Sequence, residues 1–171
     1  ALAEEEQFNL RSGDDAIDAR WFCVNYELVK TERETQGNIR RVTEQYQLQL
    51  KHEEDNIVLS ALIEVSTRIC SKRRTVGYKI LESEGIAFDH GKIIAYGIND
   101  LRERVKTTTI AFDLLPELFT LTDLQKAHEL ILNEKLLVAN FRRKMTEFVI
   151  ETDNMVEGQG HRPSKLFMQK L

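Results

Sequence analysis

Two neighbouring segments alternate between apolar and polar residues, and this pattern constrains the fold more than any other feature of the chain. In residues 42–50, one face of the alternation holds Val42, Tyr46, Leu48 and Leu50. Residues 57–69 repeat the alternation, beginning with Ile57. A period of two residues indicates a half-buried strand, and the polar stretch 52–56 has the length of a hairpin turn. The sequence therefore predicts a long antiparallel hairpin.

The composition excludes several classes of protein. The chain has 171 residues, of which 42% are hydrophobic, with 24 basic and 28 acidic side chains and a net charge of -4. This size suits one ordinary domain or two small ones. The net charge excludes a nucleic-acid-binding protein that is basic over its whole surface, but it does not exclude a local basic patch. No apolar run approaches the ~18 residues of a membrane span, and no signal peptide is visible. We therefore expect no membrane partner. The two cysteines cannot make a disulfide scaffold, so we expect a cytoplasmic protein.

Weaker patterns cover the rest of the first half of the chain. We predict a short strand at residues 16–24, a loop or short helix at the hydrophilic residues 30–41, and a third strand near residues 76–81. The loop or helix assignment for residues 30–41 rests only on their lack of apolar periodicity.

An amphipathic helix is predicted at residues 89–105, with Asp89 as its N-cap. Its apolar stripe consists of Ile93, Ile94, Ile98, Leu101 and Val105. The β-branched residues 107–112 then favour a strand.

The C-terminal part has the element order of a winged helix. Residues 122–125 have the form of a capping box that would begin a helix ending near Leu132. A turn, a short extended piece at residues 136–138 and a second helix at residues 139–148 follow, and strands at residues 149–152 and 165–168 would form a hairpin.

The second of these helices carries apolar anchors and a cluster of cations. Phe141 and Met145, one turn apart, can face the core. The polar residues available to contact DNA from this helix are Asn140, Arg142, Arg143 and Lys144. In a helix-turn-helix the second helix enters the major groove, where arginine suits guanine and asparagine suits adenine. His161, Arg162 and Lys165 of the hairpin suit phosphate contacts. A solvated helix face is the alternative, because a cluster of cations on a helix usually faces solvent, and the zero net charge of residues 117–171 weakens the case for DNA binding.

Motifs for catalysis or metal binding are weak in this sequence. Asp89 and His90 could be half of a catalytic pair, but no serine or cysteine has a suitable spacing from them, and a capping aspartate with a packed histidine is the preferred interpretation. The four histidines share no metal-ligand spacing. We therefore predict no catalytic residue and no metal site in this chain.

Several stretches resemble the Nudix-related transcriptional regulators and their close relatives, the Nudix hydrolases that bear a C-terminal winged helix. The stretches are residues 14–22, 87–90, 114–117, 119–125, 140–144 and 160–167. The wing motif departs mildly from the family pattern at His161, Ser164 and Phe167. The resemblance covers about residues 8–26 and 85–171.

The resemblance implies an α+β fold. Residues 1–107 would be the C-terminal remnant of a Nudix-like domain with an inserted β-hairpin at about residues 27–84, and residues 108–171 a winged-helix DNA-binding domain. It further implies a transcriptional regulator that binds double-stranded DNA, forms a homodimer and responds to ADP-ribose or a related nucleotide.

A Nudix box requires a glycine followed by an Arg-Glu-x-x-Glu-Glu helix whose carboxylates bind a divalent metal. Arg33 and Glu34 are followed by residues that do not fit this pattern. The resemblance would place the box upstream of Ala1, where Mg²⁺ would bind, so this chain should not hydrolyse anything. Two alternatives stay open: the C-terminal part of an ADP-ribose hydrolase whose winged helix serves packing or dimerisation, and a pure protein-interaction module.

Overall fold

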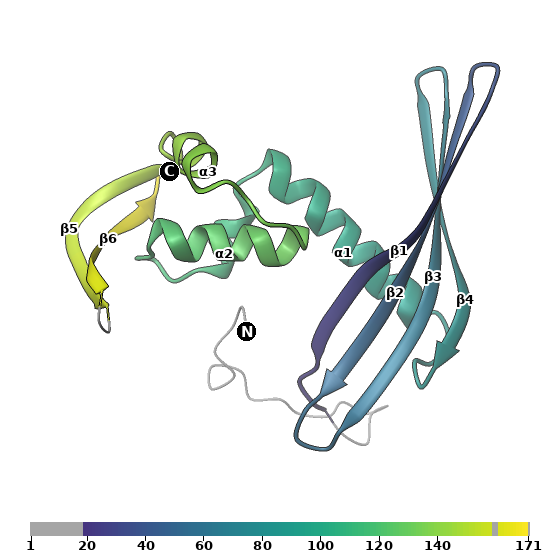
Figure 1. Ribbon diagram of the computed structural model, residues 1–171, viewed down its shortest axis with the longest axis horizontal. Helices are drawn as coiled ribbons and strands as arrows, with labels where there is room; N and C mark the ends of the chain where they lie inside the picture. The colour runs from purple at the N-terminus through teal and green to yellow at the C-terminus, as the bar shows by residue number, and fades with distance from the viewer. Residues whose placement is uncertain (1–18, 159–160, 171) are drawn as a thin grey trace. The chain divides into compact units, whose positions relative to one another are not determined.

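A computed structural model of the chain describes residues 19–158 and 161–170 (Figure 1). The chain divides into two units, one ending at Asn99 and the other beginning at Asp100. This division falls inside a helix, eight residues before the boundary at 107–108 that the resemblance implies, and the extent of a Nudix-like remnant stays a prediction.

The first unit is built on a four-stranded antiparallel sheet in the order β1-β2-β3-β4. The strands are β1 (Cys23–Gln36), β2 (Ile39–His52), β3 (Ile57–Cys70) and β4 (Arg73–Glu84). The predicted hairpin is confirmed as β2 and β3, with Leu48 directly opposite Ala61. Its turn closes with a 3.3 Å hydrogen bond from the Asn56 N–H to the Glu53 carbonyl.

At the beginning of this sheet, one prediction was wrong and another placed the start of a strand too early. Residues 30–41 are neither loop nor helix, because they form the second half of β1, a tight turn at Gly37 and the start of β2. They have no apolar alternation because both faces of this part of the sheet are largely exposed. The strand expected at residues 16–24 begins only at Cys23, and residues 16–18 lie outside the described part of the chain. The strand predicted at residues 76–81 lies within β4.

The core of the first unit lies where the sheet meets the first half of α1 (His90–Thr107). Its buried side chains are Tyr26, Leu48, Ala61, Ile63, Val65, Ile86 and Ala95. Gly91 permits a close approach, because a Cβ at this position would lie 3.4 Å from the Ala61 Cβ. The Asn99 amide donates to the Tyr26 and Tyr78 hydroxyls at 3.3 and 3.4 Å. The predicted stripe of this helix is correct except at Ile93, which is 57% exposed.

The second unit contains the rest of α1, the short 3-10 helix η2 (Ile110–Leu114), α2 (Leu121–Leu132), α3 (Val138–Met145), and the hairpin of β5 (Val149–Gly158) and β6 (His161–Gln169). The strand predicted at residues 107–112 is wrong. Ala111 and Phe112 are adjacent and both buried, whereas a strand would direct them to opposite faces. The other elements confirm the winged-helix order.

Within the described part of the chain, no helix is long and apolar enough to span a membrane.

Candidate nucleic-acid interface

Helix α2 begins with a capping box, two residues earlier than predicted. Its N-cap is Thr120, whose hydroxyl oxygen accepts a hydrogen bond from the Asp123 N–H at 3.1 Å, and the Asp123 carboxylate accepts one from the Thr120 N–H at 3.2 Å. The prediction placed Thr122 and Gln125 in these roles. The Thr120–Asp123 pair satisfies two backbone N–H groups that the first turn of a helix leaves free, so the helix begins at Leu121.

The turn between α2 and α3 is held by one carboxylate. Glu129 accepts hydrogen bonds from the Lys135 ammonium at 2.8 Å, the Gln125 amide at 2.9 Å and the Leu136 N–H at 3.1 Å. These three donors lower the pKa of Glu129 to about 2. The Gln125 amide also donates to the Leu136 carbonyl at 3.1 Å. Because α3 begins two residues later, this network orients α3 relative to α2.

Helix α3 directs its apolar residues inward, as predicted. Phe141 and Met145 are buried in a core shared with α2, η2 and the second half of α1. The ring of Phe141 meets the buried His128 ring edge-on, with centroids 5.0 Å apart. The Nδ1–H of His128, in the tautomer that this contact requires, donates to the Leu124 carbonyl at 2.9 Å. Burial lowers the pKa of His128, and the charge of Lys144 adds to the effect although the Leu124 carbonyl opposes it, so the imidazole is neutral at neutral pH.

The opposite side of α3 presents the predicted polar side chains to solvent. Asn140, Arg142, Arg143 and Lys144 are all exposed. Arg143 and Asn140 are joined by a 3.5 Å hydrogen bond. Lys144 extends to the Lys106 carbonyl at the end of α1, 3.5 Å away. Arg142 makes no side-chain hydrogen bond or ion pair with any described residue, so its guanidinium is available for a ligand.

The hairpin of β5 and β6 is fixed at its base by a residue from outside it. Phe119, just before α2, exchanges two backbone hydrogen bonds with Phe167 of β6, at 3.0 and 2.8 Å. The Phe119 ring packs edge-on against Phe112 with centroids 5.5 Å apart. Within the hairpin, Lys165 forms an exposed ion pair with Glu151. The side chains of His161 and Arg162 lie outside the described part of the structure, and their phosphate contacts stay predictions.

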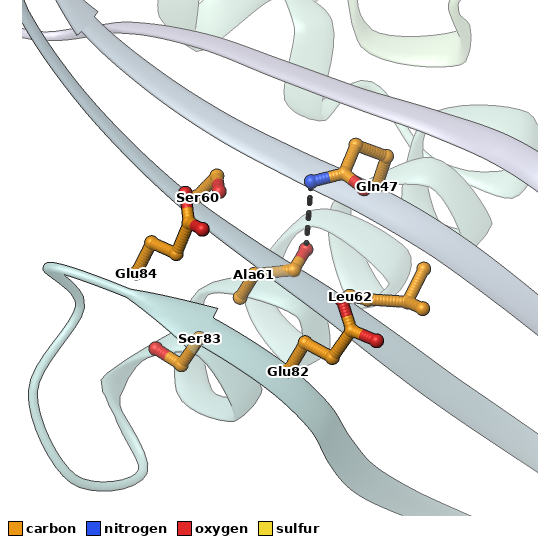
Figure 2. Close-up of a pocket in the computed structure, with 7 residues that line it drawn as sticks. All are labelled: Gln47, Ser60, Ala61, Leu62, Glu82, Ser83 and Glu84. Carbon is orange, nitrogen blue, oxygen red and sulfur yellow. Dashed lines mark hydrogen bonds between the residues drawn. The ribbon is translucent and has the colours of Figure 1, made fainter.

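A separate hollow of about 460 Å³ opens on the sheet of the first unit (Figure 2). It lies beside the irregularity where the β3–β4 register shifts between Leu62 and Ile63. Its polar lining includes the carboxylates of Glu82 and Glu84 and the Gln47 amide, which donates to the Ala61 carbonyl at 3.5 Å. No lining residue is basic, so this hollow is poorly suited to phosphates. Among the described residues, no group of three or more histidines, cysteines or carboxylates is arranged to hold a metal ion.

The geometry of α2, α3 and the hairpin agrees with a comparison to known families. Residues 111–168 match the family described as the NrtR DNA-binding winged helix domain. This segment is therefore similar to an NrtR-type winged helix domain. Its limits include Phe119, the capping box, the Glu129 network and both strands of the wing except Gln169.

The chain is also similar to individual proteins, one a transcriptional repressor and two solved as NrtR structures. The ADPR responsive transcriptional repressor NtrR of Acinetobacter baylyi is 36% identical over 83 residues, which are 48% of this chain and 33% of that protein. A crystal structure of Shewanella oneidensis NrtR complexed with a 27mer DNA is 26% identical, covers 56% of this chain and 45% of that one, and has a TM-score of 0.42. A second structure of Shewanella oneidensis NrtR is 21% identical, with coverages of 85% and 64% and a TM-score of 0.41. The chain thus spans about a third of the length of the curated relative and less than half of the chain seen with DNA.

Two features of the NrtR-type domain were missed in the sequence. Phe119 follows no strand pattern, and its pairing with Phe167 depends on residues 48 positions apart. Glu129 looks like an ordinary surface residue, but its spacing from Gln125 by four residues is a helical-pair signal that could have indicated one part of its network.

Proposed function

We propose that this chain is the DNA-binding portion of a transcriptional repressor that responds to ADP-ribose or a related nucleotide. The observation that carries the proposal is the two-sided character of α3 in an NrtR-type domain. Phe141 and Met145 are buried on one side, and Arg142 and Arg143 are exposed on the other.

The chemistry of this exposed side suits a duplex. A helix of this kind lies in the major groove, and arginine binds guanine edges or phosphate oxygens with two parallel N–H donors. The wing would contact the backbone through Lys165, His161 and Arg162. Lys165 would have to exchange its ion pair with Glu151 for a phosphate, and an exposed ion pair costs little to break.

The effector and the assembly are parts of the same proposal. The Acinetobacter relative is named for its response to ADPR, and a nucleotide of this class would relieve repression. A homodimer would present two α3 helices to a two-fold symmetric operator. A protein of this kind acts in the cytoplasm, where the DNA is accessible.

The proposal is tested by titrating the chain into a labelled 30-base-pair duplex and following fluorescence anisotropy at several salt concentrations. Loss of two phosphate or guanine contacts in R142Q/R143Q is expected to weaken binding by at least about tenfold and to flatten the salt dependence. The matched control K79Q/K92Q removes two cations of the first unit and should bind as the wild type does. Equal binding by R142Q/R143Q and the wild type would overturn the assignment of α3.

The effector is tested on the natural protein that carries this segment. Addition of ADP-ribose is expected to release the bound duplex, and adenosine serves as the control without a diphosphate. Retention of the duplex at saturating ADP-ribose would refute this effector.

A further inference from the structure

One end of the four-stranded sheet is strongly basic although the whole chain is acidic. We call residues 33–41 and 68–76, which surround the β1–β2 and β3–β4 turns, the basic tip (Figure 1). It contains one carboxylate, Glu34, and seven cations: Arg33, Arg40, Arg41, Arg68, Lys72, Arg73 and Arg74. All seven cations are exposed. The tip therefore carries a net charge of +6, compared with -4 for the chain.

Burial of apolar side chains does not explain the basic tip. The buried core of the first unit contains no residue of the tip. The apolar side chains present, such as Ile69 and Val76, are 37% and 43% exposed. The tip is therefore held mainly by the backbone ladder of the four strands.

The pairing register brings like charges together. Arg41 lies directly opposite Arg68 on one face of the sheet. On the other face, Arg40 and Arg74 lie on either side of Ile69 in one row. Like charges at directly opposed positions destabilise a sheet, so this arrangement opposes folding and indicates a demand other than stability.

Acidic neighbours do not neutralise the tip. Glu34 lies opposite Arg41 in the register, but none of the seven cations forms an ion pair with a described residue. Glu32, the next carboxylate along β1, is paired with Lys30 instead. The positive charge is thus available to an external anion.

We propose that the basic tip binds the phosphate backbone of duplex DNA, as a cationic contact additional to that of the winged helix. This inference rests on the proposed function, since it assumes that the chain encounters DNA. All six arginines lie on strands, with donors on both faces, and a ribbon of two strands fits into a major groove. Arginine is also the side chain best matched to phosphate oxygens. An acidic protein and an anionic membrane are other polyanions, and the experiment distinguishes them.

The decisive variant is R40Q/R68Q/R74Q, which removes one cation from each of β2, β3 and β4. It relieves the Arg41–Arg68 repulsion and so is expected to fold at least as well as the wild type, which circular dichroism checks. Binding to a 30-base-pair duplex is then measured between 50 and 200 mM salt. Loss of three phosphate contacts should reduce the slope of log K against log salt by about 2.7 and weaken binding at 50 mM by at least about tenfold. R40K/R68K/R74K, which keeps the charge, should retain most of the affinity.

The controls separate this inference from the proposed function. K51Q/K79Q/K92Q removes three cations elsewhere in the same unit and should bind DNA as the wild type does. If R142Q/R143Q loses affinity while R40Q/R68Q/R74Q does not, the proposed function stands and the role of the tip is overturned. If the wild type fails to bind at 50 mM salt, both are overturned. Tip-dependent binding to phosphatidylserine vesicles or polyglutamate, with unchanged binding to the duplex, also overturns the DNA assignment.

Discussion

The Glu129 carboxylate accepts a hydrogen bond from the Leu136 N–H at 3.1 Å, across the turn that separates the two helices of the helix-turn-helix. The acceptor belongs to α2 and the donor precedes α3 by two residues. Any change in this contact alters the direction in which α3 leaves the turn, and with it the placement of Arg142 and Arg143.

The first prediction concerns this carboxylate. Glu129→Gln removes the charge that attracts Lys135 and leaves an amide that cannot accept all three hydrogen bonds. We expect a lower melting temperature and weaker binding to duplex DNA than for Glu147→Gln, a substitution at an exposed glutamate of the same unit. The pKa of Glu129 is depressed to about 2 from its usual 4.5. Its contribution to stability is therefore complete above about pH 4.5 and is lost as the pH falls toward 2.

That pH dependence gives the first prediction a second readout. The difference in stability between the wild type and Glu129→Gln, measured by urea unfolding, should shrink steadily between pH 4.5 and pH 2. A difference that stays constant over this range would contradict the role assigned to the ionised carboxylate.

The second prediction concerns the buried His128. Burial lowers its pKa from 6.5, so the unfolded chain binds the proton more readily than the folded one. Stability should therefore fall as the pH decreases below about 6.5, by at most about 1.4 kcal/mol for each pH unit. His128→Gln removes this titration and should flatten the pH profile of the melting temperature between pH 5 and 7.

His90 supplies the control for this measurement. It is an exposed histidine at the start of α1, so His90→Gln makes the same substitution outside the buried core. An equal flattening in both variants would exclude the buried imidazole as the source.

The third prediction concerns the attachment of the wing. Phe119 is 3% exposed and contacts both Phe112 and β6. Phe119→Ala should cost about 3–5 kcal/mol in the free energy of unfolding and should increase amide hydrogen exchange along β6. Phe88→Ala removes a ring that is 92% exposed and should change stability by no more than about 0.5 kcal/mol. A similar cost for the two substitutions would show that the Phe119 ring does not hold the wing.

The sequence predicted those elements whose burial is periodic. Residues 42–50 and 57–69 alternate because one face of β2 and β3 meets the core. Phe141 and Met145 could be assigned to the inner side of α3 because a helical turn separates them. The winged-helix order followed from such local signals, which carry most of their information within one element.

The errors occurred where tertiary structure overrides the local pattern. Residues 30–41 form strands although their apolar residues do not alternate. Neighbouring strands satisfy the backbone groups of these residues, whereas their side chains remain largely in solvent. Residues 110–112 have strand-like composition, but the core requires Ala111 and Phe112 on the same side. For the candidate site, the exposure of Arg142 could be anticipated, whereas the Glu129 network requires three groups brought together by a turn.

The charges of the basic tip have one further consequence. Strands β1 and β4 form the two edges of a long antiparallel sheet, and an uncovered edge of this kind can pair with another copy and begin aggregation. Charged side chains at the edge oppose this pairing, and Arg33, Arg73 and Arg74 stand along these two strands. The same arginines that attract a polyanion would thus keep the sheets of separate molecules apart and keep the protein in solution when no polyanion is bound.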